Sequence, residues 1–288
     1  MRNVLFLLLA VWLGCGTTPP PAPRAHGALP QSAYIWQRQW SDAVTDAVRQ
    51  SQPQTHAVGL WPLAAELSCD NGQLRAQTVA VDYEAVGEAT ADVAVVIRVG
   101  PCPTATMDSP GATEALTEHV TEALARARHA GFEPREVQID FDATVAQLRA
   151  YTRWLQALGP AVQPTPLTIT ALPAWLGNAA LPPLLAATEG WVLQVHGLAP
   201  PTDIEHPMAI FDADTAIDWI ERAARLQRPF RVSLPTYGYV AAFDEEGTFV
   251  GLAAEQAPAT WPTGLTVVAS RSDPSAVAGL LRAVELER

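Results

Sequence analysis

The sequence contains no lysine, so arginine supplies all the basic side chains of its 288 residues. Eighteen arginines stand against 30 acidic residues, which gives a net charge of −12 and an isoelectric point of about 4.9. Binding to nucleic-acid phosphates needs clustered basic side chains, so this balance argues against a nucleic-acid partner. Hydrophobic residues make up 49% of the chain and charged residues 17%, which is typical of a folded core rather than a disordered segment.

Several catalytic and cofactor motifs are also absent from the sequence. It contains no GxGxxG or GKS/GKT phosphate loop, no GxSxG nucleophile elbow, and no HxH, HExxH or DxDxDG metal motif. We therefore expect neither a cofactor nor a metal. An alternative remains open, in which Asp140, Asp142 and His196 hold a hard cation or zinc.

The first 15 residues form a predicted signal segment. Met1–Asn3 is a short basic start, and Val4–Leu13 is an apolar run too short to span a bilayer as a mature helix. Gly14 and Cys15 follow, and this arrangement resembles a bacterial lipoprotein signal, which implies lipidation at Cys15. Trp12 departs from the Leu-like residue that is usual there. An ordinary cleaved signal or an uncleaved anchor is the alternative.

Residues 16–30 are rich in proline and read as an extended tether without a core of its own. A tether behind a lipid anchor would lift a folded domain off the membrane. We therefore expect a protein of the bacterial cell envelope, periplasmic or associated with the outer membrane. Its contact with the membrane would be through the anchor alone.

Export affects how the remaining cysteines are interpreted. With Cys15 lipidated, Cys69 and Cys102 are left as an even pair, and an oxidising compartment permits a disulfide between them. Two separate free thiols are the alternative. Their spacing excludes a CxxC metal site.

The stretch 137–142 is a predicted strand in which apolar and polar residues alternate. Ile139 and Phe141 point to one face, whereas Gln138, Asp140 and Asp142 point to the other. Helical patterns precede and follow this strand, which favours an interior parallel strand that is buried on both faces. Carboxylates at the carboxyl end of such a strand lie where α/β proteins place their sites. The alternative is a structural role, with the carboxylates held by arginine or backbone groups.

Eight strands of the parallel type, most of them followed by a helix, predict a single (β/α)8 TIM barrel over residues 31–288. A doubly wound open sheet is the runner-up. Two β-hairpins, after strands 2 and 7, are expected as insertions, the first turning at Asp70–Gly72. The predicted barrel strands are 33–36, 57–61, 93–99, 137–142, 167–172, 191–195, 230–234 and 265–269.

The carboxyl ends of barrel strands meet on one face, and polar and aromatic residues follow most of these strands. Such residues suit a carbohydrate, because aromatic rings stack on sugar faces while amides and carboxylates bind hydroxyl groups. For any single tryptophan, packing between barrel and helices is an equal alternative. The candidate catalytic residues are Asp140 and Asp142, and the candidate substrate-binding residues are Gln138, Trp36, Gln37, Trp61, Trp175, Gln194, His196, Tyr237 and Arg271.

Two segments resemble the family-18 chitinase superfamily. Residues 137–144 are similar to its fourth strand, whose motif ends DxDxE, and 233–238 are similar to its seventh-strand segment, often Pro-x-Tyr-Gly. The layout over roughly residues 33–270 more closely resembles the bacterial domain-of-unknown-function family 3142, through the segments AYIWQRQW, QIDFDA and TITALPAWL. This resemblance implies a glycosidase-like barrel and no established activity.

The chitinase motif differs from this sequence at its final position. There the last Glu is the general acid and the Asp before it orients the acetamido group of the substrate. Here Thr144 takes the place of the acid, while Asp142 and Asp140 match the supporting carboxylates. Glu66 and Glu189 are less well placed. Two functions remain open: hydrolysis with Asp142 as acid or base supported by Asp140, and glycan binding or a scaffold role without catalysis.

Overall fold

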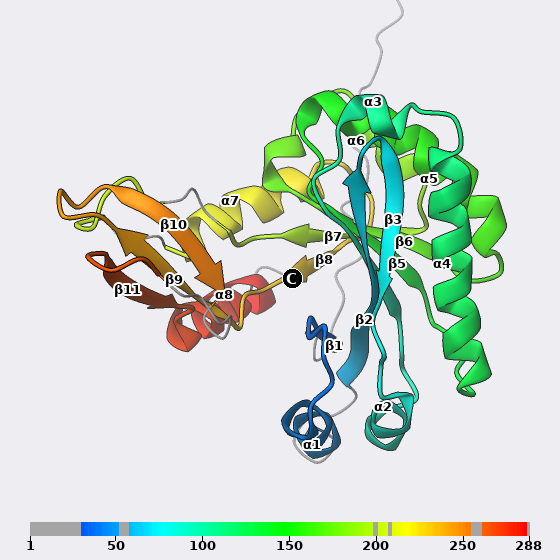
Figure 1. The fold of residues 1–288 in the computed structure, drawn as a ribbon, viewed down its shortest axis with the longest axis horizontal. Helices are drawn as coiled ribbons and strands as arrows, with labels where there is room; N and C mark the ends of the chain where they lie inside the picture. Colours follow the sequence, from blue (N-terminus) through cyan, green and yellow to red (C-terminus); the bar gives the residue numbers. More distant parts are fainter. Residues whose placement is uncertain (1–29, 52–57, 198–200, 207–208, 255–260, 287–288) are drawn as a thin grey trace, which may run out of the picture.

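The structure is a computed structural model that describes residues 30–51, 58–197, 201–206, 209–254 and 261–286 (Figure 1). The predicted signal segment 1–15 with Cys15 lies outside the described residues, as does the tether 16–30 except for its last residue. Among the described residues, no helix combines the length and the apolar character needed to cross a membrane.

The main sheet has eight strands. Seven follow the order β1-β2-β4-β5-β6-β7-β8, and β3 pairs with the carboxyl-terminal half of β2. All neighbours along this path run parallel, and β3 alone runs antiparallel. The predicted α/β class with a parallel sheet is therefore confirmed. The strands are β1 (Gln31–Ile35), β2 (Val58–Asp70), β3 (Gln73–Thr78), β4 (Val95–Val99), β5 (Val137–Phe141), β6 (Leu167–Ala171), β7 (Gly190–Gln194) and β8 (Arg231–Ser233).

Helices cover the outer face of this sheet, and α4 and α5 lie side by side against it (Figure 1). Helix α5 continues through Pro160 to Val162, although proline lacks the N–H that a residue inside a helix donates. The helices are α1 (Asp42–Gln50), α2 (Tyr83–Ala89), α3 (Thr104–Met107), α4 (Ala112–His129), α5 (Leu148–Val162), α6 (Leu181–Ala186), α7 (Ala213–Ala224) and α8 (Pro274–Leu286).

The predicted eighth barrel strand belongs to a different sheet. Residues Thr266–Arg271 form β11, which pairs antiparallel with β9 (Gly238–Phe243), and β9 also pairs with β10 (Phe249–Ala254). The prediction of 265–269 as a parallel strand was wrong. An interior strand is buried on both faces, whereas β11 is mostly exposed and ends in Ser270 and Arg271. Among the described residues no strand connects β8 to β1, so the main sheet is a curled half-barrel.

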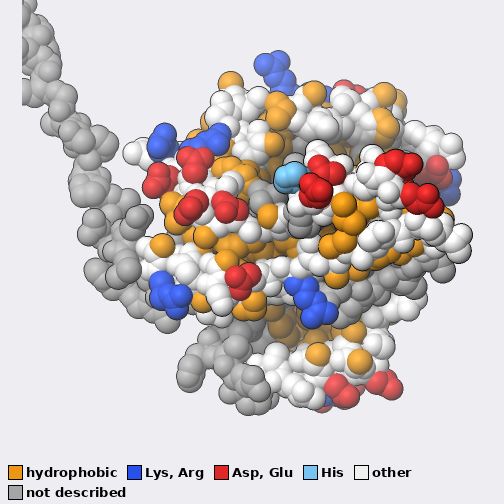
Figure 2. Space-filling model, turned by 90° about the vertical axis from the view of Figure 1, so that its left-hand side faces the viewer, with side chains coloured by type: hydrophobic (Ala, Val, Ile, Leu, Met, Phe, Trp, Pro, Cys, Tyr) orange, Lys and Arg blue, Asp and Glu red, His pale blue; other side chains and the backbone are white. Residues whose placement is uncertain are grey.

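The three-stranded sheet lies on the opposite side of the molecule from α4 (Figure 1). From that side, hydrophobic side chains lie among acidic and other polar groups (Figure 2). Val250 on β10 and Val267 on β11 are exposed. Leu252 on β10 is exposed as well, so three large apolar side chains of this small sheet reach the surface.

Strand β5 is buried along its whole length, as the sequence predicted. Ile139 and Phe141 point outward and join the core between sheet and helices, where the Phe141 ring packs against Tyr151 and Trp154. Alternation along the strand leaves Gln138 and Asp140 on the inner face of the curled sheet. The inner face at β5 is therefore polar, and its polar side chains must find partners within the protein.

Two of these inner contacts connect β5 to the edge strands. The Tyr34 hydroxyl on β1 donates a 2.6 Å hydrogen bond to Gln138, and Arg231 on β8 donates bonds of 2.6 and 2.8 Å to the buried Glu136 carboxylate. The Arg231 guanidinium also lies 4.4 Å from the ring centroid of Trp61 on β2. Side chains thus join the two edges of the sheet across its interior.

Cys69 and Cys102 form a disulfide, as predicted, with 33 residues of sequence separation. It connects the β2–β3 hairpin to the segment after β4. The hairpin and the carboxyl end of β4 are therefore held together, and both cysteines pack with the core between sheet and helices.

Candidate functional site

Charged side chains form a row across three neighbouring strands. Glu66 on β2 lies opposite Arg98 on β4, and Arg98 lies opposite Asp140 on β5. The apolar, alternating strands place these residues on the inner face near the carboxyl ends of β4 and β5, where parallel α/β sheets carry their sites. We call Glu66, Arg98, Asp140, Asp142, Thr170 and Gln194 the strand-end cluster.

Asp140 lies at the centre of the strand-end cluster and is 4% exposed. One of its carboxylate oxygens accepts hydrogen bonds from Thr170 Oγ1 at 2.7 Å and Gln194 Nε2 at 3.1 Å. Burial, together with the nearby charge of Asp142, raises the pKa of the Asp140 carboxyl to about 6. Asp140 therefore keeps a proton over a range of pH in which an ordinary aspartate is ionised.

Arg98 lies between three carboxylates. Its Nε is 3.9 Å from Glu66, its Nη1 is 3.8 Å from Asp140, and its Nη2 is 3.7 Å from Asp142. These separations are longer than hydrogen bonds, so the three interactions are ion pairs without direct bonds. The Arg98 side chain is 39% exposed, which leaves part of it accessible to solvent or a ligand.

Glu66 is held from its other side by Arg38, whose guanidinium donates bonds of 2.5 and 2.7 Å to both carboxylate oxygens. The hydrogen bond from Arg38 holds the pKa of Glu66 below its usual value, and Arg98 adds to this effect. Glu66 is therefore an ionised group and a poor proton donor.

Asp142 follows β5 directly, and 54% of its side chain is exposed. It is the carboxylate of the strand-end cluster that is most open to a ligand. Two residues later, Thr144 begins the turn before α5, and both its hydroxyl and its N–H donate hydrogen bonds to the side-chain oxygen of Gln147. Thr144 therefore acts as a helix cap.

A second polar group comes from the β7 and β8 side. The Tyr237 hydroxyl lies 2.6 Å from His196 Nδ1, and His196 Nε2 lies 3.4 Å from Ser233 Oγ. Burial lowers the pKa of His196 to about 4, so the imidazole is neutral near pH 7. Burial also raises the pKa of the Tyr237 phenol, which keeps its proton, and Asp142 and Arg98 act electrostatically on the same group. These side chains can exchange hydrogen bonds but carry no charge.

Trp36 follows β1 and is half-buried, with its ring stacked on Tyr34 at a centroid distance of 5.2 Å. The Arg98 guanidinium lies 5.9 Å from the Trp36 ring centroid, which brings Trp36 beside the strand-end cluster. The structure thus brings together six of the predicted site residues, either directly or through Arg98 or Tyr237. They are Trp36, Asp140, Asp142, Gln194, His196 and Tyr237.

Three predicted substrate-binding residues are buried and cannot contact a ligand as they stand. Trp61 packs under Arg231, Gln138 bonds to Tyr34 and Thr168, and the indole N–H of Trp175 donates to the Ala143 carbonyl within the outer core. The sequence could not show this, because a tryptophan next to a strand can lie either in the core or at the site.

Two further predicted residues lie at the surface. Gln37 is exposed in the segment after β1, and Arg271 is exposed at the end of β11, opposite Gly238. Arg271 therefore belongs to the three-stranded sheet and not to the half-barrel that carries the strand-end cluster.

Neither Arg98 nor Thr170 was among the predicted site residues, and Glu66 was expected to be less well placed than Asp140 and Asp142. One signal was present for Arg98, which is the single charged residue in the apolar run VVIRV of β4. A charged side chain is rarely buried without a partner, so such a residue in an interior strand indicates a neighbouring carboxylate. Thr170 gave no comparable signal, because threonine is common in strands.

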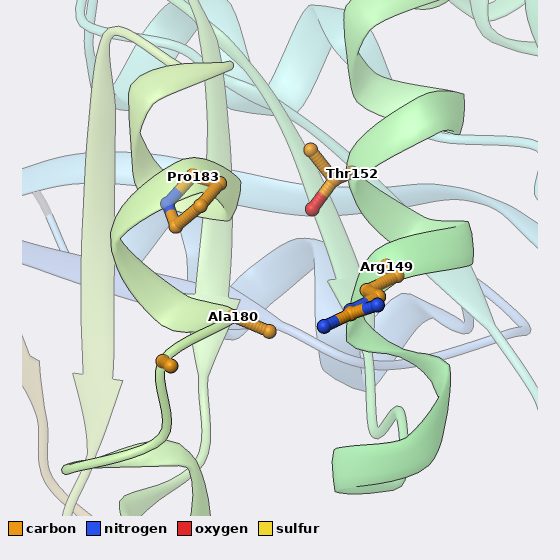
Figure 3. Close-up of a pocket in the computed structure, with 5 residues that line it drawn as sticks. Arg149, Thr152, Ala180 and Pro183 are labelled. Carbon is orange, nitrogen blue, oxygen red and sulfur yellow. The ribbon is translucent and has the colours of Figure 1, made fainter.

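No group of three or more His, Cys, Asp or Glu side chains in the described part of the chain lies close enough to hold a metal ion. The alternative of a cation held by Asp140, Asp142 and His196 therefore finds no support in the geometry. A pocket of about 210 Å³ lies elsewhere, between α5 and α6 (Figure 3). It is lined by Arg149, Thr152, Ala179, Ala180 and Pro183, none of which is a predicted site residue.

A family model described as "Domain of unknown function (DUF3142)" matches residues 93–288. This range includes β4 to α8 and most of the strand-end cluster. No curated protein matches the sequence.

Several solved structures share the fold at low sequence identity. The spore cortex-lytic enzyme SleL of Bacillus cereus aligns with a TM-score of 0.61 and 14% identity, over 88% of this chain and 68% of that one. A putative sporulation-specific glycosylase of Bacillus subtilis gives a TM-score of 0.55 and 17% identity, over 79% and 87%. A Cycas revoluta family-18 chitinase mutant in complex with (GlcNAc)4 gives 0.51 and 14%, over 88% and 80%. At these identities the likeness establishes the fold alone.

Proposed function

The chain belongs to the DUF3142 family, and we propose that it binds a carbohydrate polymer at the strand-end cluster. The observation that carries the proposal is the position of Asp142, an exposed carboxylate beside Arg98 at the carboxyl end of β5. Carboxylate and guanidinium groups bind sugar hydroxyls, and the half-buried Trp36 beside Arg98 offers an aromatic surface for a sugar face.

The fold relatives support this ligand class. They include proteins named as chitinases, a glycosylase and a cortex-lytic enzyme, and one of these chitinases is in complex with (GlcNAc)4. We propose an oligomer of N-acetylhexosamine or a related polysaccharide as the ligand of this chain, with (GlcNAc)4 as the first probe.

Binding without cleavage fits the protonation of the strand-end cluster best. Glu66 is held ionised by Arg38, and Thr144, which occupies the position of the acid in the motif it resembles, has no acidic proton. Asp140 retains a proton up to about pH 6 but is buried behind Asp142. General acid catalysis requires a donor within hydrogen-bonding reach of the leaving oxygen.

Hydrolysis is the second candidate, and one observation favours it. Burial raises the pKa of Asp140 to about 6, and the nearby charge of Asp142 adds to this effect, so Asp140 can hold a proton beside a second carboxylate, as acid–base pairs do in enzymes. In that case Asp142 would donate the proton and Asp140 would support it.

We further propose that the folded part is held at the cell envelope by lipidation of Cys15, with residues 16–30 as the spacer. The support is the sequence Gly14-Cys15 after a short apolar run and the proline-rich stretch that follows. A glycan-binding domain held in this way would remain close to the polysaccharides of the envelope.

A glycan array combined with a test for new reducing ends distinguishes the two candidates. Binding without new reducing ends selects the glycan-binding protein, and release of products selects the hydrolase. An array without any bound glycan contradicts the proposal.

A further inference from the structure

The strand-end cluster and Arg38 together hold more negative than positive charge. Three carboxylates, from Glu66, Asp140 and Asp142, lie beside two guanidinium groups, from Arg38 and Arg98. When Asp140 is ionised, one negative charge is left without a matching cation. The chain as a whole has the same sign, with a net charge of −12.

The unmatched charge is located at Asp142. Arg38 makes two hydrogen bonds to Glu66, so that pair is neutral. Arg98 must then serve all three carboxylates, at 3.7 to 3.9 Å, and makes no close bond with any of them. Asp140 also receives hydrogen bonds from Thr170 and Gln194, whereas Asp142 is exposed and has Arg98 as a shared partner.

Arg98 is shared with one more partner besides the three carboxylates. The Trp36 ring already has the Arg98 guanidinium at 5.9 Å from its centroid, within the range in which an aromatic face attracts positive charge. The second side of the site is uncharged, since His196 and Tyr237 are both neutral near pH 7.

We propose that the glycan bound at this site carries free amino groups, as in a hexosamine polymer that has lost part of its acetyl groups. This inference rests on the proposed function and specifies its ligand class. The protonated amino group would lie against the Asp142 carboxylate and neutralise the unmatched negative charge of the strand-end cluster. Arg98 determines the strength of this preference, because it is the cation that competes with the amino group for Asp142.

Isothermal titration calorimetry with (GlcNAc)4 and with the deacetylated (GlcN)4 tests the inference. The pH should lie just above the pKa of about 6 of Asp140, where Asp140 is largely ionised and the amino groups of (GlcN)4 still carry charge. We expect the wild-type protein to bind (GlcN)4 about three- to fivefold more tightly at low salt, the scale of a partly exposed ion pair. The ratio should fall towards one at high salt, because salt screens exposed charges.

Two variants are expected to change this ratio in opposite directions. Asp142→Asn removes the unmatched charge and should bring the ratio to about one, whereas Arg98→Gln removes the competing cation and should increase the ratio. Asp218→Asn, at an exposed site on α7, serves as the matched control and should leave the ratio unchanged. A wild-type protein that binds (GlcNAc)4 equally or more tightly contradicts the inference and leaves the proposed function intact. A protein that binds neither oligomer contradicts both.

Discussion

Thr144 and Gln147 are joined by two hydrogen bonds, of 3.0 Å from the Thr144 hydroxyl and 2.9 Å from its backbone N–H, both to the Gln147 side-chain oxygen. The residue in the place of a chitinase-like acid is therefore used to begin the turn before α5. This relationship supports the proposal of binding without cleavage, because the Thr144 hydroxyl has no acidic proton and already donates a hydrogen bond to Gln147.

Thr144→Glu should introduce hydrolysis. The substitution places a carboxyl group two residues after Asp142, in the position that the motif resemblance gives to the proton donor. We expect new cleavage of (GlcNAc)4, together with a loss of about 1 kcal/mol in stability from the missing cap. In the control variant Thr144→Gln, the glutamine has nearly the same size as glutamate but no acidic proton, so this variant should give no cleavage. Two outcomes would contradict the view that cleavage lacks only a proton donor at position 144. They are equal activity in both variants, and no activity in Thr144→Glu despite retained binding.

The ionisation of Asp140 should make stability depend on pH. Its folded pKa is raised to about 6 from an unfolded value near 3.9, so the folded state is favoured at low pH and loses this advantage as pH rises through 6. Asp140→Asn removes the titration. Relative to wild type, its free energy of unfolding should increase by about 2–3 kcal/mol between pH 4 and pH 7.5. Urea unfolding at both pH values measures this change, and a difference independent of pH argues against a buried, titrating Asp140.

Arg231→Met should destabilise the protein strongly. Arg231 donates two hydrogen bonds to Glu136, which is buried, so the variant leaves a carboxylate without its charged partner. We expect a loss of about 3–5 kcal/mol in urea unfolding. Arg153→Met removes an exposed ion pair with Asp108 and should cost less than about 1 kcal/mol. Similar losses in the two variants would show that the bond across the sheet interior contributes little.

Cys15→Ala should release the protein from the membrane fraction. If Cys15 carries the lipid anchor, the variant is neither processed nor lipidated and no longer enters detergent in phase partitioning. Inhibition of lipoprotein signal peptidase should block processing of the wild type. Unchanged processing and partitioning in the variant would rule out lipidation at this residue.

The sequence predicted most of the half-barrel because its strands alternate or are continuously apolar and are separated by clear turn and helix signals. β4 to β7 lie within two residues of the predicted ranges, and β5 is buried on both faces as expected. The prediction of the eighth barrel strand failed because the segment TVVASR is equally compatible with a half-exposed antiparallel strand. Which partner it takes depends on β9, and strand propensity does not encode that choice.

The two aspartates of the site could be predicted from the sequence, whereas the side chains that surround them could not. Asp140 and Asp142 stand out as acids at the end of an apolar strand. Arg98 lies 42 residues before Asp140 in the sequence, and Glu66 lies 74 residues before it. Only the register of β2, β4 and β5 brings the three residues into one row. The burial of Trp61 and Trp175 likewise depends on tertiary packing, because sequence alone does not say which side of a strand a helix will cover.

Calorimetric titration of the wild type and of Asp142→Asn with (GlcNAc)4, followed by analysis of the recovered oligomer, tests the central claim most directly. We predict that the wild type binds the oligomer and returns it uncleaved. Asp142→Asn should bind it about tenfold more weakly, the scale of one charged hydrogen bond, and the exposed control Asp218→Asn should match the wild type. Equal binding by Asp142→Asn and wild type, or cleaved oligomer after contact with the wild type, would contradict the account.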